Sequence, residues 1–317
     1  MSGVIIRAAL RKSLSRIRHV TVVRPADARG LVADVYGQAE RDFGMLAPPV
    51  ALHSPAPPTL AAAWMILRET LLATGHVDRA TKEAVAAAVS AANMCPYCVD
   101  VHETTVTTLA GDRDFAEVTA WVDGTGPLPG RPVDVPELVG VAVTFHYLNR
   151  MVNIFLPDTP LPSGVPRGAG LTVLGRFLRT SATTTVQPGG SLGLLPATPL
   201  PADLSWAAPN PVVAQAFASA AATLGRDVPD SVHTLLATTS EEATGISRAW
   251  VEDLVAALPA ADRPAGKVAL LTAFASYQLD TPVIDEYRRD HPDDRSLVEL
   301  TAWASFTAAR RLGTAMN

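Results

Sequence analysis

The sequence is short of cysteines and of long apolar runs. No stretch approaches the roughly twenty uninterrupted apolar residues that a membrane-spanning helix needs, because Arg68 and Glu69 interrupt the best candidate around residues 64–72. The first twenty residues also lack the apolar core of a signal peptide, so we expect a cytoplasmic protein without a membrane segment. Only two cysteines occur in 317 residues. In a reducing compartment, paired cysteines indicate redox chemistry or metal binding more often than a structural disulfide.

An excess of positive charge is also missing. The formal net charge is −5, so the overall balance does not favour DNA or another polyanion as a partner. The first twenty residues are a local exception, since they contain basic residues but no acidic ones. We expect either a basic helix or a solvated chain end there. Their basic residues are Arg7, Arg11, Lys12, Arg16 and Arg18. No glycine-rich phosphate loop follows a strand, so we expect no nucleotide or flavin cofactor.

Strand-like alternation of polar and apolar residues is scarce. Alanine and leucine dominate instead, and apolar residues recur every three or four positions, which is typical of helices. We therefore expect an all-α fold, and its length and 48% hydrophobic content favour two domains over one. The expected helices cover residues 59–73, 78–93, 136–155, 214–225, 245–258, 262–279 and 294–311.

The two halves of the chain resemble one another. Residues 63–94 lie over residues 249–279 with a two-residue gap, pairing Trp64 with Trp250 and Asp78 with Asp262. We infer a duplicated helical unit built around αα-hairpins. The expected division is a basic N-terminal segment (1–24), a first repeat (25–160), a Pro- and Gly-rich connector (161–205) and a degenerate second repeat (206–317).

The copies differ at the residues that could carry chemistry. Counted from the shared Asp-Arg pair, Glu83 corresponds to Lys267, Cys95 to Leu279, Cys98 to Pro282 and His102 to Glu286. Leucine and proline can therefore fill the cysteine positions of a similar scaffold. Any chemistry belongs to the first repeat, and the second is expected to be structural.

The stretch KEAVAAAVSAANMCPYCVDVHETT (82–105) contains both cysteines. If helices over 78–92 and 96–107 are joined by a tight turn, they form an antiparallel hairpin. Glu83 and His102 then lie equally far from the turn, on facing helices. We expect the carboxylate and the imidazole to come within reach of each other.

The second helix of this hairpin places Cys98 and His102 four residues apart, on one face. Cys95 lies near the helix start, where we expect Asn93 to be the cap and Pro96 to occupy the first turn. The helix N-terminus and a nearby imidazolium favour a thiolate. Two cysteines at this spacing can also close into a disulfide.

Other interpretations of these residues stay open. Zinc needs four ligands, and Cys95, Cys98 and His102 offer only three, with Glu83 as the remaining candidate. Glu83 could also be a solvated residue.

Elsewhere, we expect His53 to be a loop residue before a helix capped by Ser54 or Thr59, and His146 to have a core or interface role rather than a catalytic one. Trp64, Met65 and Leu72 are expected in the core.

The pattern Glu-x11-Cys-x-x-Cys-x3-His, formed by Glu83, Cys95, Cys98 and His102, resembles the active-site signature of the alkylhydroperoxidase AhpD family. This family belongs to the carboxymuconolactone decarboxylase-like superfamily, whose decarboxylase-type members generally lack the cysteine pair. The resemblance covers residues 40–155, and the second repeat resembles a degenerate copy. It implies that Cys98 attacks a hydroperoxide, that Cys95 resolves the sulfenic acid into a disulfide, and that Glu83 and His102 relay the proton.

The resemblance also implies partners and marks one departure. The disulfide would be reduced by an external dithiol, and single-unit relatives form rings, so a homo-oligomer is expected, with apolar faces such as residues 136–155 at the interface. AhpD has a second histidine immediately before the peroxidatic cysteine, where this chain has Tyr97, so the relay would be shorter. The alternatives are a thiol–disulfide oxidoreductase without peroxidase activity and a zinc-binding or structural helical protein.

Overall fold

The computed structural model describes residues 14–225, 227–240 and 247–316 and confirms the expected all-α class. The only strand-like pairing in this part of the chain is an isolated bridge between Ala73 and Val186. The longer helices are α2 (Gly30–Asp42), α4 (Pro57–Leu67), α5 (Arg79–Ala92), α6 (Pro96–Ala110), α8 (Val135–Phe155), α9 (Arg167–Ala182), α10 (Pro211–Thr223), α11 (Asp230–Thr238), α13 (Arg263–Phe274), α14 (Thr281–Arg288) and α15 (Asp294–Ala315).

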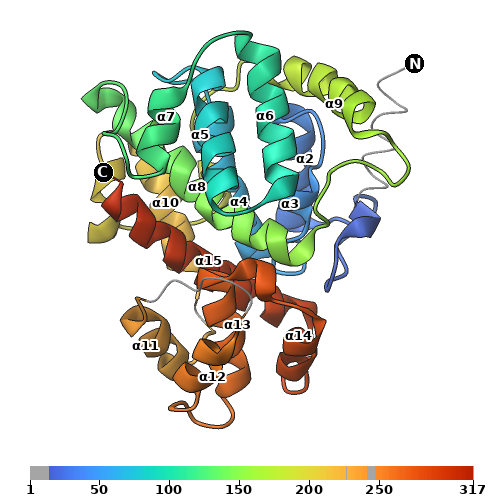
Figure 1. Cartoon of the computed structure of the whole chain (residues 1–317), viewed down its shortest axis with the longest axis vertical. Helices are drawn as coiled ribbons and strands as arrows, with labels where there is room; N and C mark the ends of the chain where they lie inside the picture. The colour runs from blue at the N-terminus through green and yellow to red at the C-terminus, as the bar shows by residue number, and fades with distance from the viewer. Residues whose placement is uncertain (1–13, 226, 241–246, 317) are drawn as a thin grey trace.

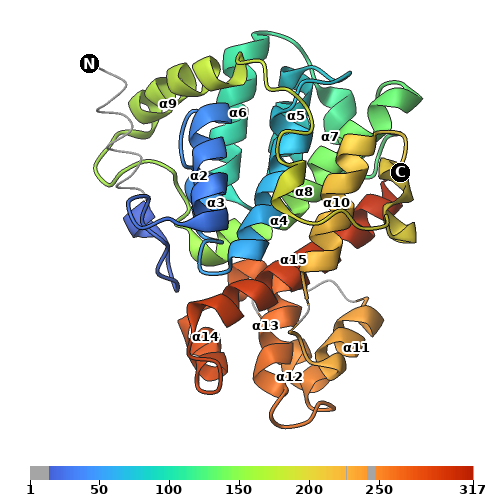
Figure 2. The same ribbon diagram turned by 180° about the vertical axis from the view of Figure 1, so that it is seen from behind.

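Short helices complete the fold. They are η1 (Leu14–Arg16), α3 (Pro48–Ala51), η2 (Arg68–Leu72), α7 (Ala116–Val122), η3 (Pro132–Asp134), η4 (Leu192–Leu194), η5 (Ala202–Ala207), α12 (Ala249–Val255) and η6 (Ser276–Gln278). Helices α2 to α10 gather in one body, α11 to α14 form a smaller group, and α15 runs between them (Figures 1 and 2). Within the described ranges, no helix has the length and apolar composition needed to cross a bilayer.

Helix α8 lies at the centre of the larger body, because it is apolar on nearly all sides. It packs against α5 and α15, and almost all of its side chains are buried. Gly313 of α15 permits the close approach of the two helices, since a Cβ there would lie 2.3 Å from Val143 Cγ2. The expectation that residues 136–155 offer an apolar face to another subunit is therefore wrong, because the chain itself covers that face.

The first αα-hairpin forms as predicted. Asp78 caps α5 by accepting a hydrogen bond from the Thr81 amide at 3.0 Å, and Pro96 occupies the first turn of α6. The chain reverses at Met94, whose φ of 50° is in the left-handed region. Asn93 ends α5 instead of capping α6, because Cys95 occupies the N-cap position and makes no side-chain cap.

The second hairpin repeats the cross-hairpin contact of the first with different chemistry. Lys267 on α13 and Glu286 on α14 form an ion pair at 3.2 Å. These two residues were paired with Glu83 and His102 by the sequence alignment. The same positions therefore face each other across both hairpins, which is what a duplicated hairpin unit requires.

Several helices lie outside the ranges expected from the sequence, among them α11 and α14. Helix α2 precedes the first expected helix, and α9 lies inside the range 161–205, where the sequence suggested a connector. Helix α9 packs against α6, and Gly175 allows this approach, since a Cβ there would lie 2.9 Å from Thr104 Cγ2. The expected basic helix over the first twenty residues lies largely outside the described residues, and the described part of that range contains only the short η1. The boundaries of the repeats stay a prediction.

Candidate functional site

Glu83 and His102 meet across the first hairpin, as the equal spacing from the turn predicted. His102 Nδ1 lies 2.6 Å from Glu83 Oε2, and both side chains are buried. Since the carboxylate can only accept a hydrogen bond, Nδ1 carries the hydrogen and Nε2 keeps a free lone pair. The interpretation of Glu83 as a solvated residue is wrong, because its side chain is only 2% exposed.

An arginine also holds the Glu83 carboxylate. Arg79, one turn earlier on α5, donates from Nε to Glu83 Oε1 at 2.8 Å. Burial alone would raise the pKa of Glu83, but the charge of Arg79 and the contact with His102 outweigh it and hold that pKa below its usual value. The Glu83 carboxylate therefore stays ionised and fixes both the orientation and the tautomer of His102.

The two cysteines lie at the start of α6 and are both free thiols in the structure. Cys95 is fully buried and Cys98 nearly so. Burial raises the pKa of the Cys98 thiol well above its ordinary value, and a hydrogen bond with Cys95 adds to this effect. The expectation that the helix start and the imidazole favour a thiolate is therefore not met in the resting protein. Removal of the thiolate from water by burial outweighs the effects of the helix start and the imidazole on the pKa of Cys98.

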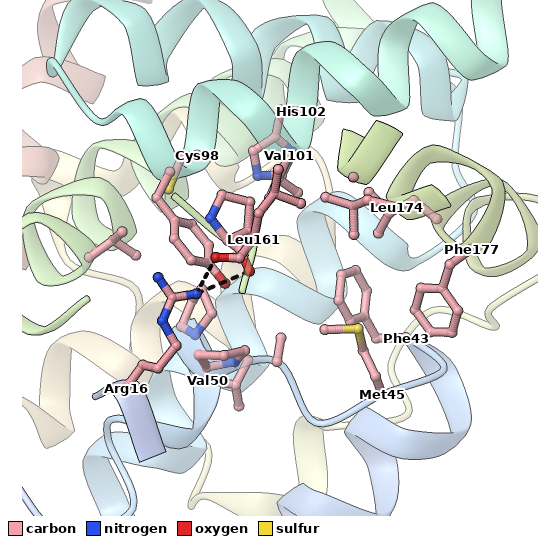
Figure 3. A pocket seen from close by; sticks show the side chains of 18 of the residues that line it. Arg16, Phe43, Met45, Val50, Cys98, Val101, His102, Leu161, Leu174 and Phe177 are labelled. Carbon is pink, nitrogen blue, oxygen red and sulfur yellow. Dashed lines mark hydrogen bonds between the residues drawn. The ribbon is translucent and has the colours of Figure 1, made fainter. Parts of the chain in front are cut away.

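A large apolar cavity opens beside Cys98 and His102. Its volume is about 820 Å³, which is in the range of small-molecule binding sites. Its walls come from α6, α8 and α9, from the α2–α3 loop and from residues 160–165. Figure 3 shows Cys98 and His102 at this cavity, with Phe43, Met45 and Phe177 along its wall. The arrangement offers the Cys98 thiol and the His102 imidazole to an apolar ligand.

The structure also settles the smaller sequence expectations. His53 lies in the turn between α3 and α4, as expected, but it is fully buried: its Nε2 lies 2.7 Å from the Tyr147 hydroxyl, and burial lowers its pKa to about 4. Neither Ser54 nor Thr59 caps α4, which begins after Ala56 without a side-chain cap. The expected core residues Trp64, Met65 and Leu72 are all buried.

His146 is a structural residue next to the hairpin turn. Its Nδ1 lies 2.9 Å from Asn93 Nδ2, and burial together with the charge of Arg150 lowers its pKa to about 3. The imidazole is therefore neutral and accepts a hydrogen bond from Asn93. A core role was expected for His146, and these contacts agree with it. Asn93 Nδ2 also donates to the Val89 carbonyl at 2.8 Å, so this pair stabilises the turn before Cys95.

Sequence reasoning missed most of the cavity wall. Helix α9 contributes Val173, Leu174 and Phe177, and the N-terminal segment contributes Arg16. The apolar residues of α9 recur at helical spacing, which was a usable signal inside the presumed connector. The position of Arg16 had no such signal.

Among the described residues, no three His, Cys, Asp or Glu side chains are grouped as metal ligands, so the four zinc candidates do not form such a site.

The hairpin lies within a region that is similar to known proteins. Residues 58–126, which contain Glu83, Cys95, Cys98 and His102, match the Carboxymuconolactone decarboxylase family. The chain is 38% identical to the alkyl hydroperoxide reductase Rv2159c of Mycobacterium tuberculosis, and the alignment covers 94% of each protein. No solved structure matches the chain. Since the similarity extends over nearly the full length of both proteins, the chain belongs to the AhpD-like family of the carboxymuconolactone decarboxylase-like superfamily.

Proposed function

We propose that the protein is a thiol-dependent hydroperoxide reductase whose reaction occurs at Cys98. The 2.6 Å contact between Glu83 and His102, on the hairpin that also carries both cysteines, is the observation that carries the proposal. The name of the Mycobacterium tuberculosis relative supports the same activity. The apolar cavity beside Cys98 favours an organic hydroperoxide over a strongly hydrated substrate.

The first step breaks the O–O bond of the hydroperoxide. Cys98 sulfur attacks the terminal oxygen and forms the sulfenic acid Cys98–SOH, while the other oxygen leaves with the alkyl group. His102 accepts the thiol proton, directly or through water, and returns a proton to the leaving alkoxide, so that the alcohol is released. The negative charge of Glu83 stabilises the transient imidazolium.

The second step removes the sulfenic acid. The Cys95 thiol attacks Cys98 sulfur, an S–S bond forms, and the hydroxyl leaves as water after taking the Cys95 proton. The hydrogen bond between the two thiols supports this step, because it holds the sulfur atoms near each other. An external dithiol that is small enough to enter the cavity then reduces the disulfide by thiol exchange and is itself oxidised to a disulfide.

Burial of the cysteines favours a peroxide over a protein disulfide as oxidant. Exchange with a protein disulfide needs direct sulfur–sulfur contact, and Cys95 has no exposed surface while Cys98 is 4% exposed. A hydroperoxide is small at its reacting end and reaches Cys98 through the cavity. The thiol–disulfide oxidoreductase alternative therefore has less support from the geometry. Self-association stays a prediction, which light scattering tests.

The experiment is hydroperoxide consumption with a dithiol donor. Cys98→Ser is expected to abolish turnover, because serine cannot be oxidised by the peroxide. Cys95→Ser is expected to consume one equivalent and then stop, with Cys98 trapped as a sulfenic acid by dimedone. Retained turnover in Cys98→Ser would contradict the proposal. Faster turnover of a disulfide substrate than of any hydroperoxide would support the oxidoreductase alternative.

A further inference from the structure

Arg16 brings a permanent positive charge to an otherwise apolar cavity. Its guanidinium lines the same cavity as Cys98 and His102, and no Asp or Glu is among the described residues that line it. Arg16 Nη1 donates to the Leu161 carbonyl at 2.6 Å and to the Pro160 carbonyl at 3.4 Å, and Nη2 donates to the Thr159 carbonyl at 3.2 Å. These neutral partners orient the guanidinium without cancelling its charge.

Tyr97 adds a polar group to the same cavity, close enough to Arg16 and Cys98 to interact with both. Burial raises the pKa of its phenol, and Arg16 is close enough to oppose that rise while Cys98 reinforces it. The hydroxyl is therefore neutral and able to donate a hydrogen bond to an anion. Tyr97 occupies the position where AhpD has its additional histidine, so this chain has a hydrogen-bond donor that cannot serve as a base at neutral pH.

The remaining walls are suited to an alkyl chain. Figure 3 shows Arg16 and Cys98 on one side of the cavity, with Phe43, Met45 and Phe177 on the other. An aliphatic chain removed from water by these side chains contributes favourable free energy in proportion to the apolar area buried. The volume of about 820 Å³ leaves room for a ligand much larger than hydrogen peroxide.

We propose that Arg16 binds the carboxylate of an amphipathic substrate, and that the preferred hydroperoxide is that of a long-chain carboxylic acid. A guanidinium recognises a carboxylate with two parallel hydrogen bonds, and the low polarity of the cavity strengthens that contact. The alkyl chain would lie along the apolar wall while the O–O bond reaches Cys98. The inference rests on the proposed function, since it names the substrate class of the same site.

The first test compares three substrates in the unaltered protein, and therefore does not depend on a variant that folds. The probes are linoleic acid hydroperoxide, its methyl ester and tert-butyl hydroperoxide. Loss of a charge-assisted pair lowers affinity by about tenfold or more, so kcat/KM is expected to be at least about tenfold higher for the acid than for the ester. Equal values for the acid and the ester would overturn the inference.

The second test uses Arg16→Gln, with Arg18→Gln as the matched control, since Arg18 is an exposed arginine two residues away that does not line the cavity. Arg16→Gln is expected to raise KM for the acid by about tenfold or more. KM for the ester and for tert-butyl hydroperoxide should stay unchanged. Arg18→Gln is expected to leave KM unchanged for all three substrates. If Arg16→Gln lowered kcat/KM equally for all three substrates, Arg16 would only support the fold. That result would overturn the inference.

A binding measurement separates this inference from the proposed function. Oleate cannot be reduced, and we expect it to bind Cys98→Ser protein and to lose about tenfold or more in affinity when Arg16→Gln is added. If oleate binds in this way but no hydroperoxide is turned over, the proposed function fails and the carboxylate site stands. If tert-butyl hydroperoxide is reduced but oleate does not bind, the carboxylate site fails alone.

Discussion

Replacing Glu83 with glutamine tests the role of its negative charge. The carboxylate lies 2.6 Å from His102 Nδ1 and 2.8 Å from Arg79 Nε, away from solvent. Glutamine keeps the length of the side chain and can still accept the hydrogen bond from Nδ1. What it removes is the charge that stabilises the imidazolium while His102 carries the proton from Cys98.

The magnitude follows from the strength of such contacts. Hydrogen bonds to charged groups contribute about 1.5–3 kcal/mol, and about 1.4 kcal/mol corresponds to a tenfold change in rate. If most of this contribution arises only when the imidazole is protonated, kcat/KM falls by about ten- to 150-fold in Glu83→Gln. KM is expected to change little, because Glu83 does not line the cavity.

The assay is single-turnover oxidation of reduced protein by tert-butyl hydroperoxide, followed by loss of free thiols. Glu103→Gln is the matched control, since Glu103 is an exposed carboxylate on α6, next to His102. We expect the control to react at the wild-type rate, and thermal unfolding shows whether each variant is folded. A folded Glu83→Gln protein that reacts within about twofold of wild type would refute the charge-stabilisation argument.

Further predictions follow from the burial of the site and from the helix packing. Because burial raises the pKa of Cys98 above its ordinary value of 9.0, the fraction of thiolate and hence the rate of alkylation by iodoacetamide should keep increasing up to and beyond pH 9. A plateau near neutral pH would contradict this. Gly313→Ala should lower the free energy of unfolding by about 1–3 kcal/mol, because the new methyl group collides with Val143, and denaturant unfolding measures the loss. Lys267→Met breaks the ion pair with Glu286 on a partly exposed surface and should leave hydroperoxide turnover unchanged, which a direct activity assay checks.

The hairpin and the contact between Glu83 and His102 could be predicted because local rules determine them. Pro96 and the polar turn indicate where one helix ends and the next begins, and the equal distance of Glu83 and His102 from that turn places them opposite each other. The duplication was visible for the same reason, because the aligned Lys267 and Glu286 form the corresponding contact. A prediction from the spacing of residues along two antiparallel helices does not depend on the rest of the fold.

Properties that depend on distant packing could not be predicted. The pKa of Cys98 depends on how deeply α6 is buried beneath α8 and α9, and the local sequence suggested the opposite direction of shift. Helix α8 looked like an exposed apolar face because nothing in its sequence shows that α15 covers it. Arg16 reaches the cavity from more than sixty residues before the hairpin, a contact that no spacing rule encodes.

The most direct test of the account is the fate of the thiols after one equivalent of organic hydroperoxide. We expect both thiols of each chain to be lost together, with one equivalent of alcohol formed and a mass decrease of two hydrogen atoms, as an intramolecular disulfide between Cys95 and Cys98 requires. Two free thiols after the peroxide is consumed, or a disulfide only between separate chains, would contradict the proposed chemistry.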